Sequence, residues 1–563
     1  MKSVKNIAIL FLFVPLLVIV SCDDGLVEVN ENPNGVESSV VDPNLLISSV
    51  MTGLATSMTT RSYSGDTGAA SQFIQKDSWS NNRYDWETGT IWNKNYELLR
   101  TNKVAYERAV ELGLPFHEGV TLILKSMLFG NLTDYYGDIP YSQALNGSGG
   151  LEGERPAYDT QETVYRGIIA DLETASSLLG GSSYQGVIEK QDLFYGGDAS
   201  KWQKLANSLA LRYYMRLSEK LPAFAQGGVT STLAKPLISE IDDELVLSYI
   251  GGIDSQSWPS SGQFGSASDF YRVKPCTTLT DKLKELEDPR IAVWFAPVAV
   301  PTKVVPAAEV PGGVDMVEED GIRYINEESL DANDYAIYAQ ATYASDLQAG
   351  KKLIDTSSVY VGLPVAVSAV DPYEYNLNSE GSRGGTNSYV SRMNEVFNQK
   401  DDGGNLLKAR LFSYAELSFL KAEAALRGWG SDAEGNYLEG IKASLEVWGV
   451  GDTYSDYVMN AGVAYAGTLE QVLEQKWIAN MFNGDEAYMD WRRTGLPDLS
   501  AGPFAREDVM PLRFIYPDDE INNNSANNSA AAASLEETPY SSTDPNDSPY
   551  ARPWIVQGVS TPW

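Results

Sequence analysis

The chain has 563 residues and a formal net charge of −34 at pH 7, and 43% of its residues are hydrophobic. This hydrophobic content predicts a globular protein with a large core, while the negative surface makes nucleic acid an unfavourable partner. The only histidine is His117, which excludes His-rich zinc sites and leaves a single residue that could serve a Ser-His-Asp triad. Any catalysis would therefore depend on carboxylates.

The N-terminus predicts a cleaved signal peptide. Two lysines precede an apolar run of 14 residues from Ile7 to Val20. As a helix, this run would reach about 21 Å, short of the roughly 30 Å hydrocarbon core of a bilayer. Residues 1–21 are therefore typical of a secretory signal peptide. The ending "IVSC" resembles a bacterial lipobox, which predicts a lipid on Cys22. An uncleaved anchor, or ordinary cleavage near Ser21, is the alternative.

Helical periodicity dominates the chain from residue 22 to 220. Apolar residues recur at three- and four-residue spacings over 44–58, 90–112 and 117–136. The clearest pattern predicts a helix that begins after Asp198, a suitable N-cap. One face of this helix carries Trp202, Leu205, Leu209, Tyr213 and Leu217. The stretch 160–179 is a candidate antiparallel partner.

The part from residue 221 to 408 has a different composition, rich in Gly, Pro, Ser and Val. Repeated prolines over 294–313 deny this stretch a long helix or a central strand. We expect loops, short strands and one helix at 279–289. Long irregular insertions on a helical scaffold often carry binding surfaces, so this part is predicted to face the ligand.

A second helical pair is predicted late in the chain. The stretches 413–430 and 432–450 are joined through Gly428 and Gly430, which can end a helix. The pair resembles a tetratricopeptide repeat in length. The predicted fold is therefore mostly α: tetratricopeptide-like helix pairs form a scaffold over 22–220 and 409–500, with a loop-rich insertion containing short strands. Residues 501–563 are expected to form a surface C-terminal segment.

Five blocks of sequence resemble successive signatures of one family. They are "GNLTDYYGDIPYSQAL", "GGDASKWQKLANSLALRYYMRLS", "SYAELSFLKAEAALRGW", "LEQVLEQKWIANMFNGDEAYMDWRRTGLPDL" and "FIYPDDEINNN", in this order along the chain. These blocks look like those of SusD/RagB-type lipoproteins, the SusD-like outer-membrane nutrient-binding proteins of Bacteroidetes. The resemblance extends over nearly all of the mature chain, which implies a single SusD-like domain from residue 22 to 563.

The resemblance implies a function as well as a fold. Such proteins are anchored by an N-terminal lipid to the outer membrane, facing the cell exterior. Each covers a partner SusC-like TonB-dependent transporter and captures oligosaccharides or polysaccharides or, in some branches, peptides. The family implies no catalysis, and we expect no cofactor and no metal.

Two segments have the composition expected of a glycan site, with aromatic residues beside amide or charged residues. Sugar rings stack on aromatic faces, and their hydroxyl groups need planar donors and acceptors. Family members often place ligand contacts in the early loop, where the candidates are Trp79, Asn81, Arg83, Tyr84 and Trp86. The loop-rich part adds Trp258, Phe264, Tyr271 and Arg272. The alternative is that both segments simply pack against the scaffold.

The Trp-Arg-Arg block around Arg492 and Arg493 is expected to maintain the fold, because Asp485, Glu486, Asp490 and Asp498 offer nearby carboxylates.

Two other functions of the protein stay open. A glycoside hydrolase needs two opposed carboxylates, and the acidic runs 242–244 and 318–320 look like solvated loops instead. A helical scaffold that binds only proteins is the other alternative, although the clustered aromatics speak against it.

Overall fold

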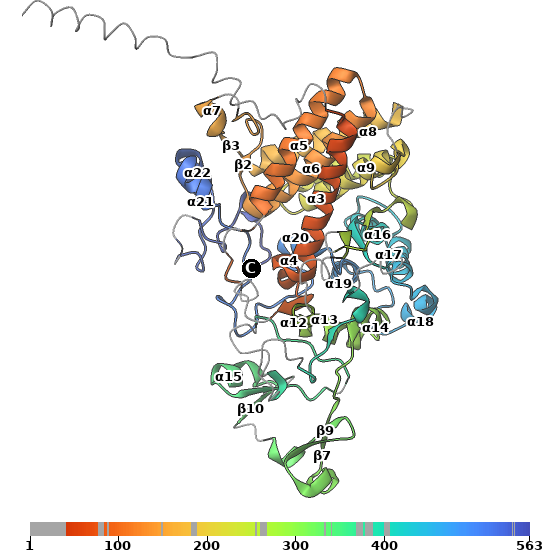
Figure 1. The fold of residues 1–563 in the computed structure, drawn as a ribbon, viewed down its shortest axis with the longest axis vertical. Helices are drawn as coiled ribbons and strands as arrows, with labels where there is room; N and C mark the ends of the chain where they lie inside the picture. The colour runs from red at the N-terminus through yellow and green to blue at the C-terminus, as the bar shows by residue number, and fades with distance from the viewer. Residues whose placement is uncertain are drawn as a thin grey trace, which may run out of the picture. The chain divides into compact units, whose positions relative to one another are not determined.

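The computed structural model describes residues 41–76, 84–86, 89, 91–147, 150–181, 189–253, 256–258, 267–330, 334–338, 340–357, 359–366, 375–377, 387–398, 406–542, 544 and 547–563. Residues Pro43–Trp563 form one compact unit, drawn in Figure 1. The predicted signal peptide and Cys22 lie outside the described residues. The structure confirms a mostly helical fold with short strands.

Five long helices pack side by side in the first half of the scaffold (Figure 1). They are α3 (Pro43–Ser64), α5 (Ile91–Leu112), α6 (Pro115–Tyr136), α8 (Gln161–Gly181) and α9 (Ala199–Arg216). Contacts join α3 to α5, α5 to α6, α6 to α8 and α8 to α9, so that neighbours in the chain are neighbours in space. Because α6 also contacts α3 and α9, it is buried on nearly every face.

Helix α9 begins as the sequence predicts. The Asp198 carboxylate accepts hydrogen bonds from the backbone N–H groups of Ser200 and Lys201, at 2.9 and 3.1 Å. The whole predicted apolar stripe is buried. Every residue from Leu205 to Arg216 is buried, however, including Leu211 and Met215 on the opposite face. The apolar pattern therefore identified one packing face of a helix that has two.

The late helix pair is also confirmed. Helix α16 (Tyr414–Leu426) is capped by Ser413, and α17 (Ala433–Val447) is capped by Asp432. The two helices contact each other, and α19 (Leu469–Ala479) packs against both. At Gly440 a Cβ atom would lie 2.8 Å from the Phe419 ring, so a glycine there permits this close approach. Helix α20 (Gly484–Thr494) contacts α3, α9 and α19.

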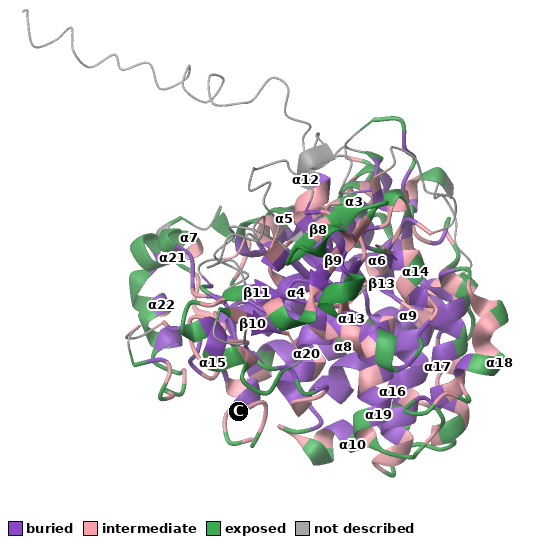
Figure 2. Ribbon diagram, turned by 90° about the horizontal axis from the view of Figure 1, so that it is seen from below, coloured by how far each residue is buried: buried purple, intermediate pink, exposed green. Residues whose placement is uncertain are grey.

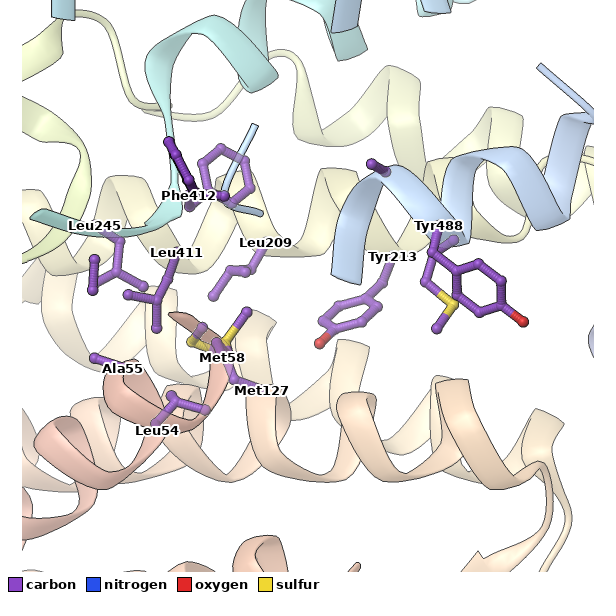
Figure 3. Packing of buried hydrophobic residues seen from close by; sticks show 14 of the residues in the cluster. Leu54, Ala55, Met58, Met127, Leu209, Tyr213, Leu245, Leu411, Phe412 and Tyr488 are labelled. Atoms are coloured by element: carbon purple, nitrogen blue, oxygen red, sulfur yellow. The ribbon is translucent and has the colours of Figure 1, made fainter. Parts of the chain in front are cut away.

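Apolar side chains from distant parts of the chain meet between these helices, as Figure 3 shows. Leu54 and Met58 of α3 and Met127 of α6 lie beside Leu209 of α9 and Leu411 of β13 (Lys408–Phe412). All five are buried. In Figure 2 the buried residues are concentrated in α8, α9, α16 and α20.

The loop-rich insertion contains more helix than predicted. The expected helix is α13 (Thr277–Glu285), but the described residues of the insertion also form α10 (Pro222–Thr232), α12 (Ala267–Arg272), α14 (Arg290–Trp294) and α15 (Tyr343–Gln348). Helices α12, α14 and α15 are short, with six residues or fewer, whereas α10 has 11 residues. The remaining short helices of the described chain are α4 (Asp66–Ala70), α7 (Leu151–Glu154), α18 (Tyr454–Tyr457), α21 (Asp518–Asn523) and α22 (Ser525–Ala532).

The strands are short and pair in small sheets. The three-stranded sheet has the order β7 (Thr302–Val305), β9 (Ile322–Asn326) and β8 (Met316–Glu319). The proline-flanked β7 is at its edge, as the proline pattern requires. The two-stranded pairs join β1 (Ile74–Lys76) to β5 (Val273–Pro275), β2 (Ile139–Pro140) to β3 (Tyr158–Asp159), β4 (Leu245–Ser248) to β13, β6 (Phe295–Ala296) to β12 (Arg392–Met393), and β10 (Tyr335–Ile337) to β11 (Lys352–Ile354).

The C-terminal segment differs from the prediction. Residues Leu512, Phe514 and Tyr516 are buried, as are Tyr550 and Val556 farther along. The Phe514 N–H donates to the Tyr135 carbonyl at 2.9 Å, and its ring packs against α6. The segment is therefore inserted into the core at these positions, because its alternating apolar side chains fill the space beside α6, and only parts such as α21 lie at the surface.

A buried charge network occupies the centre of the scaffold. Its cations are Arg61, Arg212, Arg216, Lys476, Arg492 and Arg493, and its carboxylates belong to Asp134, Glu416, Glu423, Asp485, Glu486 and Asp490. Equal numbers of opposite charges offset the cost of removing each ion from water.

The Trp-Arg-Arg block enters this network, which confirms its structural role. The Arg493 guanidinium donates to both oxygens of Glu423, at 2.5 and 2.8 Å, and to Asp490 at 2.9 Å. Arg492 donates to the carbonyl of Leu512 at 2.9 Å. Asp490 is one of the predicted partners, whereas Glu423 lies on α16 and could not be identified from neighbouring sequence.

Candidate functional site

A short antiparallel ladder pairs the strand that precedes the first candidate segment with the strand that follows the second. In the pairing of β1 with β5, Ile74 faces Pro275 and Lys76 faces Val273. The end of β1 therefore lies beside the start of β5. The first segment follows Lys76 directly in the chain, and the second ends in α12, immediately before Val273. We call this place the ladder edge, defined by Lys76, Val273 and α12.

A partly exposed polar cluster surrounds α12 at the ladder edge. The Tyr271 hydroxyl donates to the Glu395 carboxylate at 3.2 Å, and the Arg392 guanidinium lies 4.9 Å from the centre of the Tyr271 ring. Arg392 and Glu395 form an ion pair at 3.1 Å, with side chains 36% and 49% exposed. An aromatic ring, a planar cation and a carboxylate thus meet where solvent reaches them, and Arg272 is only part-buried beside them.

The ladder is held in place by Gln72, whose side chain is 1% exposed. Its amide N–H donates to the Ser500 carbonyl at 2.7 Å, and its amide oxygen accepts from the Thr278 hydroxyl at 2.6 Å. The same amide donates to the Tyr84 hydroxyl at 3.3 Å. Gln72 adopts φ 56°, an unfavourable value for a residue with a Cβ atom. These contacts tie the start of β1 to α13 and to Ser500, immediately before the C-terminal segment.

Gln75 on β1 is a second buried amide, and its side chain is 0% exposed. Among the described residues, neither its amide nitrogen nor its amide oxygen has a hydrogen-bond partner. A buried amide without partners is costly. The sequence around Gln75 does not indicate that its amide is buried, because a single glutamine next to apolar residues is equally typical of a strand with one solvent-exposed face.

Three of the predicted ligand residues are buried in the core. Tyr84, Trp86 and Trp258 are 0%, 2% and 1% exposed. The Trp86 ring stacks on Phe514 with centroids 4.5 Å apart, and the Trp258 ring meets Phe482 edge-on at 5.5 Å. A sugar cannot stack on a ring whose faces are already covered, so these aromatics have the packing role that the alternative interpretation gave them.

The other predicted residues have different positions. Tyr271 and Arg272 lie at the ladder edge, in α12. Trp79, Asn81, Arg83 and Phe264 lie outside the described residues. The structure adds Arg392 and Glu395, which sequence reasoning missed because they follow α12 by more than a hundred residues and meet it only in the folded chain, through contacts with Tyr271.

In the acidic run 242–244, considered for catalysis, two carboxylates are held by cations. Asp243 is buried and paired with Lys204 at 2.7 Å. Glu244 is also buried, lies 3.4 Å from Arg410 and accepts from the Tyr414 N–H at 3.0 Å. Two residues of the run 242–244 are therefore structural ion-pair partners, contrary to the expected solvated loop. His117 is likewise structural: its Nε2 lies 2.9 Å from the Asn44 amide oxygen.

Comparison with known proteins assigns the family. The family model described as "Starch-binding associating with outer membrane", SusD-like, matches residues 33–318 and 366–517. The chain belongs to the SusD-like family. No curated protein matches the sequence. Members of this family are binding proteins of the outer membrane, and across the described part of the chain every helix is too short or too polar to cross a bilayer.

Solved structures share the fold of this SusD-like chain. A SusD homologue from Bacteroides fragilis has 20% sequence identity and a TM-score of 0.68, covering 92% of this chain and 100% of its own. A chitin-binding SusD homologue from Flavobacterium johnsoniae has 20% identity and a TM-score of 0.65, with coverage of 91% and 99%. Another structure, described as a chitin-binding protein, has 24% identity and a TM-score of 0.65, with coverage of 91% and 99%.

Proposed function

We propose that this protein binds nutrient glycans, as oligo- or polysaccharides, at the ladder edge and delivers them to a partner SusC-like TonB-dependent transporter. The observation that carries the proposal is the antiparallel register of β1 and β5. This register places the end of β1, where the first segment begins, beside the start of β5, where the second segment ends. The sequence independently marks both segments as aromatic and rich in amides or charges. The family description as starch-binding supports a carbohydrate ligand.

The contacts at the ladder edge suit a sugar. Tyr271 offers an aromatic surface for the apolar C–H face of a ring. Arg392 and Arg272 offer planar groups of N–H donors, and Glu395 offers acceptors for hydroxyl groups. The partial exposure of the Arg392–Glu395 pair lets a ligand compete for its hydrogen bonds without unpairing a buried charge. Trp79, Asn81, Arg83 and Phe264 complete the proposed site from the sequence alone.

We place the protein on the outer face of the outer membrane, held by a lipid on Cys22. A single acyl chain binds a membrane only marginally, so stable anchoring requires more than one chain or the transporter itself. The substitution Cys22→Ala should release the protein from the membrane fraction. Unchanged fractionation of this variant would contradict the lipid anchor.

The proposal includes no catalytic step. A glycoside hydrolase needs two carboxylates facing each other across the scissile bond, and Asp243 and Glu244 are instead occupied by Lys204 and Arg410. The check is an assay for new reducing ends with each glycan that the protein binds. Sustained turnover would overturn the binding-only function.

The first experiment is native-gel retardation of the chain from Asp23 to Trp563, run through gels that contain starch, chitin derivatives, mannan, fructan or host glycans. Selective retardation by one or two glycans supports the proposal and identifies the ligand class. The second candidate is a peptide ligand, because some members of the family bind peptides. Retardation by none of the glycans, together with saturable binding of peptides, would replace the glycan by a peptide.

A further inference from the structure

The helical scaffold contains a cavity of about 300 Å³ built from elements that take no part in the ladder edge. Helices α5, α6 and α8 supply its walls, and residues 141–145 cover one side. Pockets for small molecules in proteins span about 300–1,000 Å³. This scaffold cavity is therefore large enough for one small molecule and too small for a strand of a polysaccharide.

Aromatic rings form part of the cavity wall. Tyr106 comes from α5, Phe129 from α6, and Tyr141 from the segment after β2. The rings of Phe129 and Tyr141 meet edge-to-face, with centroids 4.7 Å apart and an interplanar angle of 82°. The aliphatic side chains of Leu99 and Leu122 extend the apolar surface. Phe129 is buried, and Lys125 Nζ lies 5.3 Å from the centre of the Tyr141 ring. The part-buried Tyr106 ring is therefore the aromatic surface that offers a face to the C–H side of a sugar.

A buried amide on the wall has an unmet hydrogen-bonding group. Asn102 on α5 is 3% exposed, and its amide nitrogen donates to the Thr121 carbonyl at 2.9 Å. Its amide oxygen accepts no hydrogen bond from any residue that the structure describes. Leaving such an acceptor without a donor costs free energy. A hydroxyl or N–H group in the cavity would remove that cost.

The charged groups around the cavity are paired and balanced. Lys125 and Asp171 form an ion pair at 2.8 Å, and the Tyr141 hydroxyl donates to the same carboxylate at 3.3 Å. Lys103 and Glu107 form a second ion pair. With two cations and two carboxylates, the lining favours neither an anion nor a cation. It does offer several donors and acceptors that a neutral polar molecule can use.

We propose that the scaffold cavity binds a small neutral polyhydroxylated molecule, a mono- or disaccharide, at a second site separate from the ladder edge. The Tyr106 ring takes the face of the sugar, and the hydroxyl groups of the sugar reach Asn102 and the Lys125–Asp171 pair. This second site does not depend on the function proposed for the ladder edge, because no described residue is shared between the two.

Two substitutions test the second site. Ala144 lies on the cavity wall and is part-buried, so Ala144→Phe fills the space without changing the helices. Tyr106→Ala removes one aromatic wall. Thr101→Ala is the matched control, because Thr101 precedes Asn102 on the same helix and does not line the cavity. Tyr271→Ala with Arg392→Ala serves as the control that disables the ladder edge.

Binding is measured by saturation-transfer NMR titration of the chain from Asp23 to Trp563 with glucose, mannose, N-acetylglucosamine, maltose and cellobiose, each alone. We expect at least one sugar to bind saturably to the wild type and to the ladder-edge variant. Ala144→Phe and Tyr106→Ala should each weaken that binding by about tenfold or more, and Thr101→Ala by less than about twofold. The melting temperature of each variant reports whether it is folded.

Three results would overturn the second site. The first is that none of the five sugars binds saturably to the wild type. The second is that binding survives both cavity variants and disappears in the ladder-edge variant, which would place the sugar at the ladder edge. The third is that Thr101→Ala weakens sugar binding as much as the two cavity variants do, which would make the loss a general effect on α5. Because separate variants disable the two sites, failure of one proposal is distinguishable from failure of the other.

Discussion

Charged residues have different surroundings in the scaffold and at the ladder edge. In the scaffold, Arg493 and Glu423 are buried and joined by two hydrogen bonds at 2.5 and 2.8 Å. At the ladder edge, Arg392 and Glu395 form one ion pair at 3.1 Å and remain 36% and 49% exposed. The same residue types therefore hold the fold in one region, where both side chains are buried, and stay partly exposed to solvent in the other.

The largest expected effect comes from breaking the buried network. Arg493→Ala leaves Glu423 and Asp490 without a shared partner, which should lower the free energy of unfolding by about 3–5 kcal/mol. Chemical denaturation measures the change. The control is Arg166→Ala, which removes an exposed ion pair with Glu162 on α8 and should cost less than about 1 kcal/mol. Equal costs for the two variants would contradict the distinction between buried and exposed charges.

The two tryptophans of the early segment should have different roles, Trp86 in stability and Trp79 in glycan binding. Trp86→Ala removes a ring stacked on Phe514 and should destabilise the protein by about 3–5 kcal/mol. Trp79→Ala, in the sequence-based part of the proposed site, should weaken glycan binding by about tenfold while leaving the melting temperature unchanged. Denaturation and affinity electrophoresis of both variants provide the check. A Trp86→Ala protein with wild-type stability and lost affinity would reverse the assignment.

The stability of the network should depend on pH through Asp490. Burial alone would raise the pKa of this carboxyl, but Lys476 and Arg493 lower the pKa well below its usual range. A depressed pKa adds stability above the unfolded value of about 3.9, and this stability is lost as the pH falls through the folded value.

The variant Asp490→Asn isolates this contribution. At pH 7 it should be less stable than the wild type by about 2–3 kcal/mol, and the difference should shrink as the pH falls from about 5 to 2. Urea denaturation of both proteins across this pH range gives the difference. A gap that stays constant down to pH 2 would show that the Asp490 charge does not contribute.

The smallest effect is expected at a helix start. Asp198→Ala removes the side chain that caps α9 and should cost about 1 kcal/mol. The companion variant Asp198→Ser retains an oxygen acceptor and should restore most of the loss. Denaturation midpoints of the pair measure the cap. No difference between Ala and Ser would mean that the two N–H groups are satisfied by water.

Local sequence predicted those elements whose start or position is determined by neighbouring residues in the chain. Asp198 begins α9, Ser413 begins α16, and the proline-flanked β7 is an edge strand, since caps and prolines act on their own neighbours. The resemblance to SusD-like proteins then identified the family over most of the chain.

Long-range packing decided what local sequence could not. An aromatic beside amides or charges is typical of both a binding loop and a core residue with a polar neighbour. Trp86 is buried because Phe514 covers its ring, and Arg212 is buried because Glu416 of α16 neutralises it at 2.7 Å. Neither partner lies near its residue in the sequence. The same limitation hid Arg392 and Glu395, which contact Tyr271 of α12 although they follow it by more than a hundred residues.

Tyr271 provides the most direct test of a glycan site at the ladder edge. Isothermal titration of the glycan retained in the native gel compares the wild type with Tyr271→Ala, while thermal denaturation follows both proteins. We predict about tenfold or greater loss of affinity with an unchanged melting temperature, since Tyr271 is part-buried at the surface. Wild-type affinity in this variant would contradict a glycan site at the ladder edge.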